Sequence, residues 1–283
     1  MELRQIQYFI ALYEEGSVTQ AARRMNVVQP AISQQMSKLE ASFGQPLFHR
    51  TSRGMVPTQA GEDAYAQLRP IMHQLDNVRQ ELSVAKGVIK GHVAIGAVAS
   101  VAGSLLSSTL NSFSNAYPQV TVRCTGGYSA DLLEMLRNAQ LDVAIVNTPR
   151  NHSDFEVEEV LSEEFALFCA PGHRFAKRSR VDLADIPQDE FVIPSSRHGL
   201  RSVIDMAARA RSITIRPRLE IDEIATIEDF VAQSDYVTVL PPIAVRRAYR
   251  TGRLKRVMLT PAISRSIVCA TSPSRPMSPA TRL

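Results

Sequence analysis

Two short helical segments joined by a tight turn, between Ser17 and Gly44, constrain the fold of this chain more than any other feature. Ser17 and Gln20 have the spacing of a capping box, which predicts that a helix begins at Ser17. Asn26 tolerates the left-handed conformation that ends a helix, and Pro30 suits the first position of the next one, where an amide hydrogen is not needed. Gly44 suits the position just beyond that second helix. The spacing therefore predicts a helix-turn-helix.

The second of these helices has one apolar and one polar side. Side chains expected in the core recur at helical spacing: Ile32, Met36, Leu39 and Phe43. The other side carries donors and acceptors that can pair with base edges and phosphates if the helix lies in the major groove of DNA: Gln29, Ser33, Gln34, Ser37 and Lys38. The pattern indicates a DNA-reading helix, and the alternative is a small helical domain whose polar face is only hydrated.

Further elements complete a small N-terminal domain. Apolar residues at helical spacing predict a first helix between residues 3 and 16. Two short strands are expected at residues 47–50 and 55–57, around a turn that carries Arg53. Three helices followed by such a hairpin predict a winged helix-turn-helix.

A long helix is expected from Thr58 to about residue 86. Its apolar residues step by four and three in alternation: Ala64, Leu68, Ile71, Leu75, Val78, Leu82 and Ala85. A seam of this length buries best against a second helix, which predicts dimerisation through Leu68, Ile71, Leu75, Val78 and Leu82. The alternative is a core helix of one domain. Pro70 is expected to bend the helix, and the glycines within residues 86–91 predict a hinge.

After Gly91 the pattern changes to strands that alternate with helices, which predicts a parallel α/β arrangement. In a first series, strands are expected at residues 92–97, 121–125 and 142–146, with helices ending near 117 and 138. In a second series, strands are expected at residues 165–170, 191–193, 218–221 and 236–240, with helices at about 199–210 and 224–234. Two such series suggest two units with a cleft between them.

Polar residues follow the carboxyl ends of these strands, where open α/β sheets bind ligands and helix N-termini offer free N–H groups. They are Ser100, Ser129, Asn147, Thr148, Ser195 and Ser196. Each serine taken singly is more simply a helix cap, and only their convergence favours a site. Positive charge is added nearby by Arg197, His198 and Arg201. These side chains indicate either a site for a small anionic ligand or a hydrated basic face, and the two interpretations are equally good. A further basic set is expected to be a hydrated face or an interface: Arg246, Arg247, Arg250, Arg253, Lys255 and Arg256.

The composition of the chain argues against some classes of protein but does not indicate a function. The chain has 283 residues and a formal net charge of +4, which permits nucleic-acid binding without establishing it. Its three cysteines, Cys124, Cys169 and Cys269, have neither disulfide nor zinc spacing, and no basic and apolar leader or bilayer-spanning run occurs. A cytoplasmic protein without metal or cofactor is expected. Catalysis is not expected, because nucleophile-elbow, Walker and paired-histidine motifs are missing.

Several stretches in one register closely resemble the LysR-type transcriptional regulators: Ser17-Val18-Thr19-Gln20-Ala21-Ala22, Gln29-Pro30-Ala31-Ile32-Ser33, Leu39-Glu40, Leu47-Phe48-His49-Arg50 and Pro57-Thr58-Gln59-Ala60-Gly61. The resemblance implies a multi-domain chain with an N-terminal all-α winged helix-turn-helix at residues 1–57 and a linker and dimerisation helix at 58–87. An α/β effector-binding domain, similar to a periplasmic binding protein, would occupy residues 88–283. Its subdomain I would span about 92–162 and 266–283, and subdomain II about 163–265.

The resemblance also implies functional residues and partners. Gln29, Pro30, Ser33, Gln34 and Lys38 would face the DNA groove, and Arg50 and Arg53 would meet phosphates. The implied effector contacts are Ser100, Ser129, Asn147 and Ser196, then Thr148, Ser195, Arg201 and Ile224. The implied partners are double-stranded promoter DNA, a small-molecule effector, further copies in a homodimer or homotetramer, and RNA polymerase; a membrane is not among them.

The chain departs from the family pattern in two places. Ser234 and Tyr236 stand where the family usually has glycines, so the local turn is expected to differ. The sequence also stops at Leu283, where a closing helix usually begins, which predicts a shortened product. A solute-binding receptor without a DNA role remains the alternative function, because the C-terminal half alone would allow it.

Overall fold

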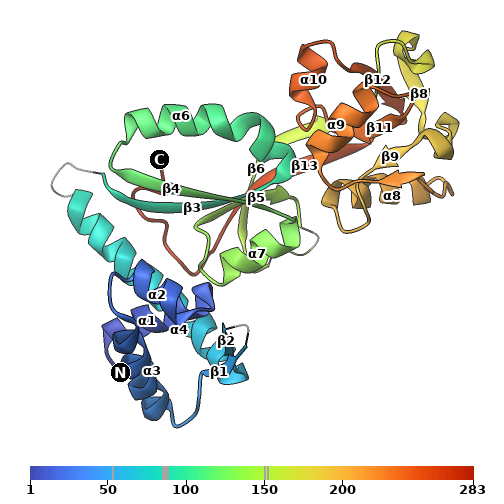
Figure 1. Cartoon of the computed structure of the whole chain (residues 1–283). Coiled ribbons are helices and arrows are strands. Elements are labelled where there is room, and N and C mark those ends of the chain that lie inside the picture. Colours follow the sequence, from blue (N-terminus) through green and yellow to red (C-terminus); the bar gives the residue numbers. More distant parts are fainter. Residues whose placement is uncertain (53, 85–88, 150, 152) are drawn as a thin grey trace. The chain divides into compact units, whose positions relative to one another are not determined.

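The computed structural model describes the whole chain except residues 53, 85–88, 150 and 152 (Figure 1). It forms two compact units. The N-terminal unit comprises residues 1–89 with 138–140 and 274–283, and the C-terminal unit comprises residues 90–137 and 141–273. The sequence did not predict that residues 274–283 would pack with the N-terminal unit. Residues 86–88 of the expected hinge lie outside the described residues, as does Ala85.

The N-terminal unit consists of four helices and a hairpin (blue to cyan in Figure 1). In chain order these are α1 (Leu3–Glu15), α2 (Val18–Arg24), α3 (Gln29–Phe43), β1 (Phe48–Thr51), β2 (Gly54–Pro57) and α4 (Gln59–Val84). The predicted signals at Ser17, Asn26 and Gly44 are confirmed, whereas Pro30 is the second residue of α3 and not the first. The Ser17 hydroxyl accepts the Gln20 amide hydrogen at 3.5 Å, and Asn26 ends its turn at a φ of 54°. Gly44 caps α3 in the left-handed conformation.

The three N-terminal helices share one core. Ile32, Met36 and Leu39 of α3 are buried as predicted, and they pack with Phe9 and Leu12 of α1. The prediction for Phe43 is wrong, since its side chain is 40% exposed. Phe43 is the last residue of α3, where the helix runs out of the core. The core therefore takes three of the four residues on the apolar stripe.

The hairpin forms the predicted wing. β1 and β2 pair antiparallel, from Phe48 opposite Pro57 to Thr51 opposite Gly54. The amide of Met55 donates a hydrogen bond of 2.8 Å to the carbonyl of Gly16, in the turn between α1 and α2. This bond ties the wing to the helix-turn-helix.

Helix α4 begins as predicted, because the Thr58 hydroxyl accepts the amide hydrogen of Gly61 at 3.0 Å. Pro70 lies inside the helix. Leu68 is buried in the core of the N-terminal unit, so it does not lie on an exposed stripe. The other predicted dimerisation residues are exposed apolar side chains: Ile71, Leu75, Val78 and Leu82.

The C-terminal unit contains two main sheets. The first sheet has the strand order β4-β3-β5-β13-β6. Its strands are β3 (Gly91–Val98), β4 (Val120–Gly127), β5 (Val143–Asn147), β6 (Glu156–Glu164) and β13 (Ser264–Thr271). Its helical segments are α5 (Ala99–Val101), a π-helical turn at Ala102–Leu106, α6 (Ser107–Ala116) and α7 (Ser129–Arg137). Figure 1 shows α6 and α7 on opposite faces of this sheet.

The second sheet has the strand order β11-β7-β12-β8. Its strands are β7 (Ala166–Cys169), β8 (Arg180–Asp182), β11 (Val237–Leu240) and β12 (Lys255–Thr260). A separate parallel pair is formed by β9 (Val192–Ile193) and β10 (Leu219–Glu220). The helices are α8 (Gly199–Arg209), α9 (Ile224–Ala232) and α10 (Arg246–Arg250), with short 3-10 turns at Arg174–Lys177, Leu183–Asp185 and Gln188–Glu190.

The predicted parallel arrangement holds for only part of the two sheets. β3 pairs parallel with β4 and β5, but β13 runs antiparallel to both β5 and β6, and β7 runs antiparallel to β11 and β12. The chain passes between the two sheets twice, from β6 into β7 and from β12 into β13. At this crossing the amide of Phe165 donates to the carbonyl of Ile263 at 2.7 Å.

Candidate nucleic-acid interface and effector site

The polar side of α3 is exposed as a continuous surface. Ile32, Met36 and Leu39 anchor the opposite side of the helix in the core. All five predicted groove-facing residues are exposed: Gln29, Pro30, Ser33, Gln34 and Lys38. The major groove of DNA is wide enough to admit an α-helix, and a helix that is anchored on one side can present its polar side to the bases. The arrangement can place amide, hydroxyl and ammonium groups against base edges and phosphates.

The wing carries a further exposed cation. Arg50 lies on β1 and is exposed, while Phe48 on the same strand is buried in the core. The buried phenylalanine fixes the strand, so the arginine is held on a rigid support and not on a loose loop. Arg53, the other predicted phosphate contact, lies outside the described residues.

A polar cluster that sequence reasoning missed connects α1, α2 and α4. The carboxylate of Glu14 accepts hydrogen bonds from the Tyr65 hydroxyl at 2.8 Å and from Arg69 Nε at 3.2 Å, and it pairs with Arg24 Nη2 at 2.6 Å. Burial works against ionisation of Glu14, but the Tyr65 bond and the two guanidinium groups outweigh it and hold the pKa of Glu14 below its usual value. The cluster fixes the helix-turn-helix on α4.

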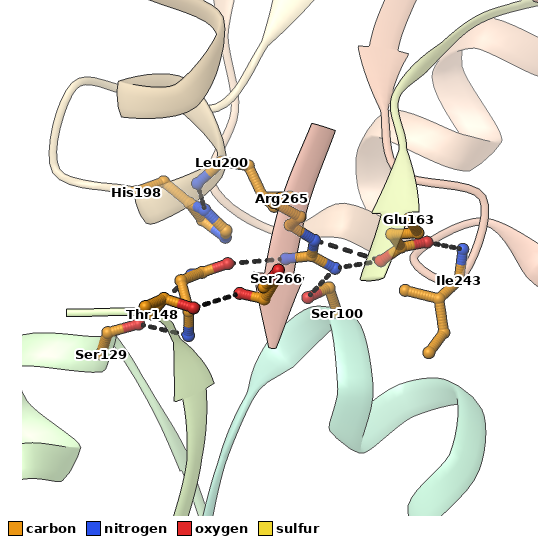
Figure 2. A network of polar contacts seen from close by, with 10 residues as sticks. Ser100, Ser129, Thr148, Glu163, His198, Leu200, Ile243, Arg265 and Ser266 are labelled. Atoms are coloured by element: carbon orange, nitrogen blue, oxygen red, sulfur yellow. Dashed lines mark hydrogen bonds and ion pairs between the residues drawn. The ribbon is translucent and has the colours of Figure 1, made fainter. Parts of the chain in front are cut away.

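In the C-terminal unit, a buried arginine organises the predicted effector residues (Figure 2). Arg265 on β13 stands opposite Glu163 on β6, and its Nε and Nη2 atoms lie 3.1 and 2.7 Å from one Glu163 oxygen. Its Nη1 donates to Asn147 Oδ1 at 3.0 Å, and its Nη2 donates to the Ser100 hydroxyl at 3.1 Å. Two predicted effector residues therefore meet at one guanidinium.

Ser129 extends this arrangement. Its hydroxyl accepts hydrogen bonds from the backbone amide and the side-chain amide of Asn147, at 3.3 and 3.2 Å. Thr148, the next residue, donates its hydroxyl to the carbonyl of Ser266 at 3.2 Å. The name Arg265 network is used below for Ser100, Ser129, Asn147, Glu163 and Arg265. It joins the starts of α5 and α7 to the ends of β5 and β6.

The start of α8 faces the same residues. A Cβ atom added to Gly199 would lie 2.7 Å from Asn147 Nδ2, so the backbone approaches the network closely. His198 caps this helix, because its Nδ1 accepts the amide hydrogen of Leu200 at 3.2 Å. Burial lowers the pKa of His198, and the Arg265 guanidinium lowers it further against the opposing effect of Asp222. The imidazole is therefore neutral near pH 7, and Arg265 supplies the buried positive charge.

Arg201 and Ile224, two of the predicted effector residues outside the network, have other partners. Arg201 is buried, and its guanidinium bonds Asp205 at 2.8 Å, Glu220 at 2.7 Å and the Pro194 carbonyl at 3.2 Å. Ile224 is buried in the core around the second sheet. Arg201 is engaged by carboxylates of its own helix and of β10, and Ile224 contributes to packing, so contact of either residue with an effector stays a prediction.

A second set of contacts links loops that follow β4, β9 and β10. The Tyr128 hydroxyl donates to Asp222 at 3.1 Å, and the amide of Ser195 donates to the other Asp222 oxygen at 2.9 Å. Arg197 lies over the Tyr128 ring at 5.8 Å. The predicted contact Ser196 is exposed beside them. Sequence reasoning missed Tyr128 and Asp222, since nothing in their local pattern indicates that they meet.

The remaining basic set is exposed along α10 and the start of β12. Arg253 pairs with Asp229 at 2.6 Å, and Arg256 lies over the Tyr249 ring at 5.3 Å. Across residues 1–52, 54–84, 89–149, 151 and 153–283, no three His, Cys, Asp or Glu side chains form a metal-binding group. No helix in the described part of the chain combines the length and the apolar content needed to cross a bilayer.

A winged helix-turn-helix on one chain with a two-sheet α/β unit, in which polar strand ends meet, is typical of DNA-binding regulators that carry an effector-binding domain. The model of the bacterial regulatory helix-turn-helix protein, lysR family, matches residues 3–62, and the model of the LysR substrate binding domain matches residues 86–283. The chain belongs to the LysR family and is a DNA-binding transcriptional regulator with an effector-binding domain.

Known relatives agree with this assignment. The nitrogen assimilation regulatory protein nac of Escherichia coli (strain K12) is 31% identical over 270 residues, which cover 94% of this chain and 87% of that protein. The fold is similar to that of a full-length OxyR variant from Pseudomonas aeruginosa, with a TM-score of 0.81 at 22% identity over 100% of this chain and 91% of that one. It is also similar to full-length CbnR complexed with its target DNA, with a TM-score of 0.69 at 21% identity, covering 99% of this chain and 96% of that one.

Proposed function

We propose that this regulator reads promoter DNA with the exposed polar side of α3 and holds the phosphate backbone with Arg50. The observation that carries this proposal is the continuous set of exposed polar side chains on a helix whose other side is fixed in the core: Gln29, Pro30, Ser33, Gln34 and Lys38. Base contacts would supply sequence discrimination, and Arg50, with Arg53, would supply sequence-independent affinity.

Dimerisation through α4 is the second part of the proposal. Ile71, Leu75, Val78 and Leu82 expose apolar side chains at steps of four, three and four. Such a stripe is buried most effectively by a second copy of the same helix. A dimer would present two α3 helices to an inverted repeat, with half-sites about one helical turn of DNA apart or a multiple of it. A tetramer, contact with RNA polymerase, and a cytoplasmic location remain predictions.

The third part concerns the effector. We infer a small anionic molecule that binds at the Arg265 network, and this inference is supported by the buried guanidinium between Ser100 and Asn147. The N-terminal end of α8, which approaches Asn147 closely, adds further positive potential through the helix dipole. The effector would shift the equilibrium between two conformations of the C-terminal unit by binding one of them more tightly.

Arg50→Ala and Ser33→Ala are expected to separate the two kinds of DNA contact. Arg50→Ala should weaken binding to every duplex, and the slope of log affinity against log salt concentration should fall by about one, as expected for the loss of one phosphate contact. Ser33→Ala should instead reduce the difference in affinity between preferred and other DNA sites. Fluorescence anisotropy on genomic fragments selected by the wild-type protein measures both effects.

Arg246→Ala serves as the control for charge, since it removes an exposed arginine from the C-terminal unit. The DNA interface proposed here is wrong if Arg50→Ala keeps the wild-type salt dependence and Ser33→Ala keeps the wild-type preference among fragments.

Ser100→Ala is expected to abolish the response to the effector while DNA binding persists. The substitution removes a buried hydroxyl that accepts from Arg265, and it lies outside the N-terminal unit. The measurement is thermal shift and DNA anisotropy with a panel of small carboxylates and inorganic anions. Ser108→Ala, an exposed serine on α6, is the matched control. An unchanged response in Ser100→Ala would place the effector elsewhere.

A further inference from the structure

Arg265, the arginine of the Arg265 network, is deeply buried, with 5% of its surface exposed. A guanidinium cannot lose its charge under ordinary conditions, so its burial demands an anion in direct contact. Glu163 supplies that anion, and the Glu163 side chain is itself nearly buried. The low polarity around the pair strengthens any interaction of Arg265 with a negative group.

The pairing geometry leaves Arg265 with two kinds of partner. On one side its Nε and Nη2 atoms both donate hydrogen bonds to a single oxygen of Glu163. On the other side Nη1 and Nη2 hold Asn147 and Ser100, the residues proposed to contact the effector. The second oxygen of Glu163 accepts the backbone amide hydrogen of Ile243 at 3.2 Å. Glu163 therefore binds Arg265 as the carboxylate of a small ligand would.

The pair also stands where the chain crosses between the two sheets. Glu163 is the penultimate residue of β6, and Arg265 is the second residue of β13. Through Ile243, which follows β11, Glu163 is bonded to the loops of the second sheet, and through Ser100 and Asn147, Arg265 is bonded to the first. A ligand that took the place of Glu163 would break the bond to Ile243 and change how the two sheets are linked.

We propose that Glu163 is a built-in competitor for the effector: the carboxylate or other oxyanion of the effector displaces the Glu163 carboxylate from Arg265. This inference rests on the effector site proposed above, and it explains why that site would select a negatively charged effector. The strength of the Arg265–Glu163 contact sets the threshold of the response, because an effector must interact with Arg265 better than Glu163 does. Neutral molecules do not meet this requirement.

The test uses the full-length protein and sodium acetate as the probe, with sodium chloride at equal ionic strength as the reference. Glu163→Gln leaves the buried guanidinium without its counter-ion, which destabilises the C-terminal unit. Acetate is expected to restore the melting temperature of this variant and to bind it about tenfold or more tightly than the wild-type protein, because the competing carboxylate is gone. Equal acetate affinity in the two proteins would overturn the proposal.

Asp205→Asn is the matched control, since it removes a carboxylate that pairs with the buried Arg201 at 2.8 Å outside the network. It is expected to be destabilised without rescue by acetate. Rescue of both variants to the same extent would show general anion stabilisation and would also overturn the proposal. Where Glu163→Gln does not fold, Glu163→Asp keeps the charge with a shorter reach, and its acetate affinity should rise severalfold; no rise would contradict the competition.

Two further variants separate this inference from the proposed effector site. Adding Arg265→Gln to Glu163→Gln removes the cation, and acetate rescue is expected to disappear. Adding Ser100→Ala to Glu163→Gln is expected to weaken acetate binding, because the hydroxyl borders the vacated position. If acetate binding is lost on Ser100→Ala but does not depend on Glu163, the effector site stands and the competitor role fails. If acetate rescues Glu163→Gln regardless of Ser100 and Arg265, the site itself is wrong.

Discussion

Ile32→Ala is expected to lower the free energy of unfolding of the N-terminal unit by about 2–5 kcal/mol. Ile32 is fully buried on the core side of α3, so the substitution leaves a cavity between α3 and the helices that support it. DNA binding should be lost with the fold of this unit, while the C-terminal unit keeps its own unfolding transition. Calorimetry and far-ultraviolet circular dichroism during denaturant titration follow the two transitions.

Ser37→Ala is the control for Ile32→Ala, because Ser37 is an exposed residue on the same helix. Its effect on stability should stay within about 0.5 kcal/mol. An Ile32→Ala protein that unfolds like the wild type would mean that α3 does not depend on this core.

Gly54→Ala should have the second large effect, a loss of roughly 2–4 kcal/mol in the N-terminal unit together with weaker DNA binding. Gly54 has a φ of 124°, which L side chains rarely adopt, and an added Cβ would overlap the carbonyl oxygen of Gly16. The two clashing atoms are the added Cβ and a backbone carbonyl oxygen, so rotation of a side chain cannot relieve the clash. The wing would have to move away from the turn between α1 and α2, and Arg50 would move with it.

Gly44→Ala provides the comparison for this prediction. Gly44 also has a positive φ, 72°, but nothing lies within 4 Å of an added Cβ. Its expected cost is the conformational strain alone, about 1 kcal/mol. Denaturant unfolding of the two variants measures the difference, and equal destabilisation would show that contact between the wing and the turn contributes nothing.

Local signals explain why much of the N-terminal unit could be predicted from the sequence. Capping by Ser17 and Thr58, the left-handed residues Asn26 and Gly44, and apolar spacing in α1 and α3 all act within one or two helical turns. Phe43 was misplaced because periodicity assigns a side of a helix and does not say where the surrounding core ends.

The C-terminal unit was harder because its decisive contacts join distant parts of the chain. Four of the nine residues of β6 are exposed glutamates, so the strand lacks the apolar run or alternation that marks a strand in a sequence. Arg265 and Glu163 are 102 positions apart, and only the antiparallel pairing of β13 with β6 brings them together. Arg201 could have been read differently: Asp205, four residues later on the same helix, is a nearby partner for its charge.

The acidic strand β6 has a consequence for how copies of this chain coexist. β6 is the last strand of its sheet, and the open edge of a last strand is a template for uncontrolled pairing with other chains. Val160 on this strand is 57% exposed, yet glutamates surround it along the edge: Glu156, Glu158, Glu159 and Glu164. Their mutual repulsion would oppose growth of the sheet from one molecule into the next, leaving self-recognition to surfaces, such as that of α4, where assembly stops at a defined number of subunits.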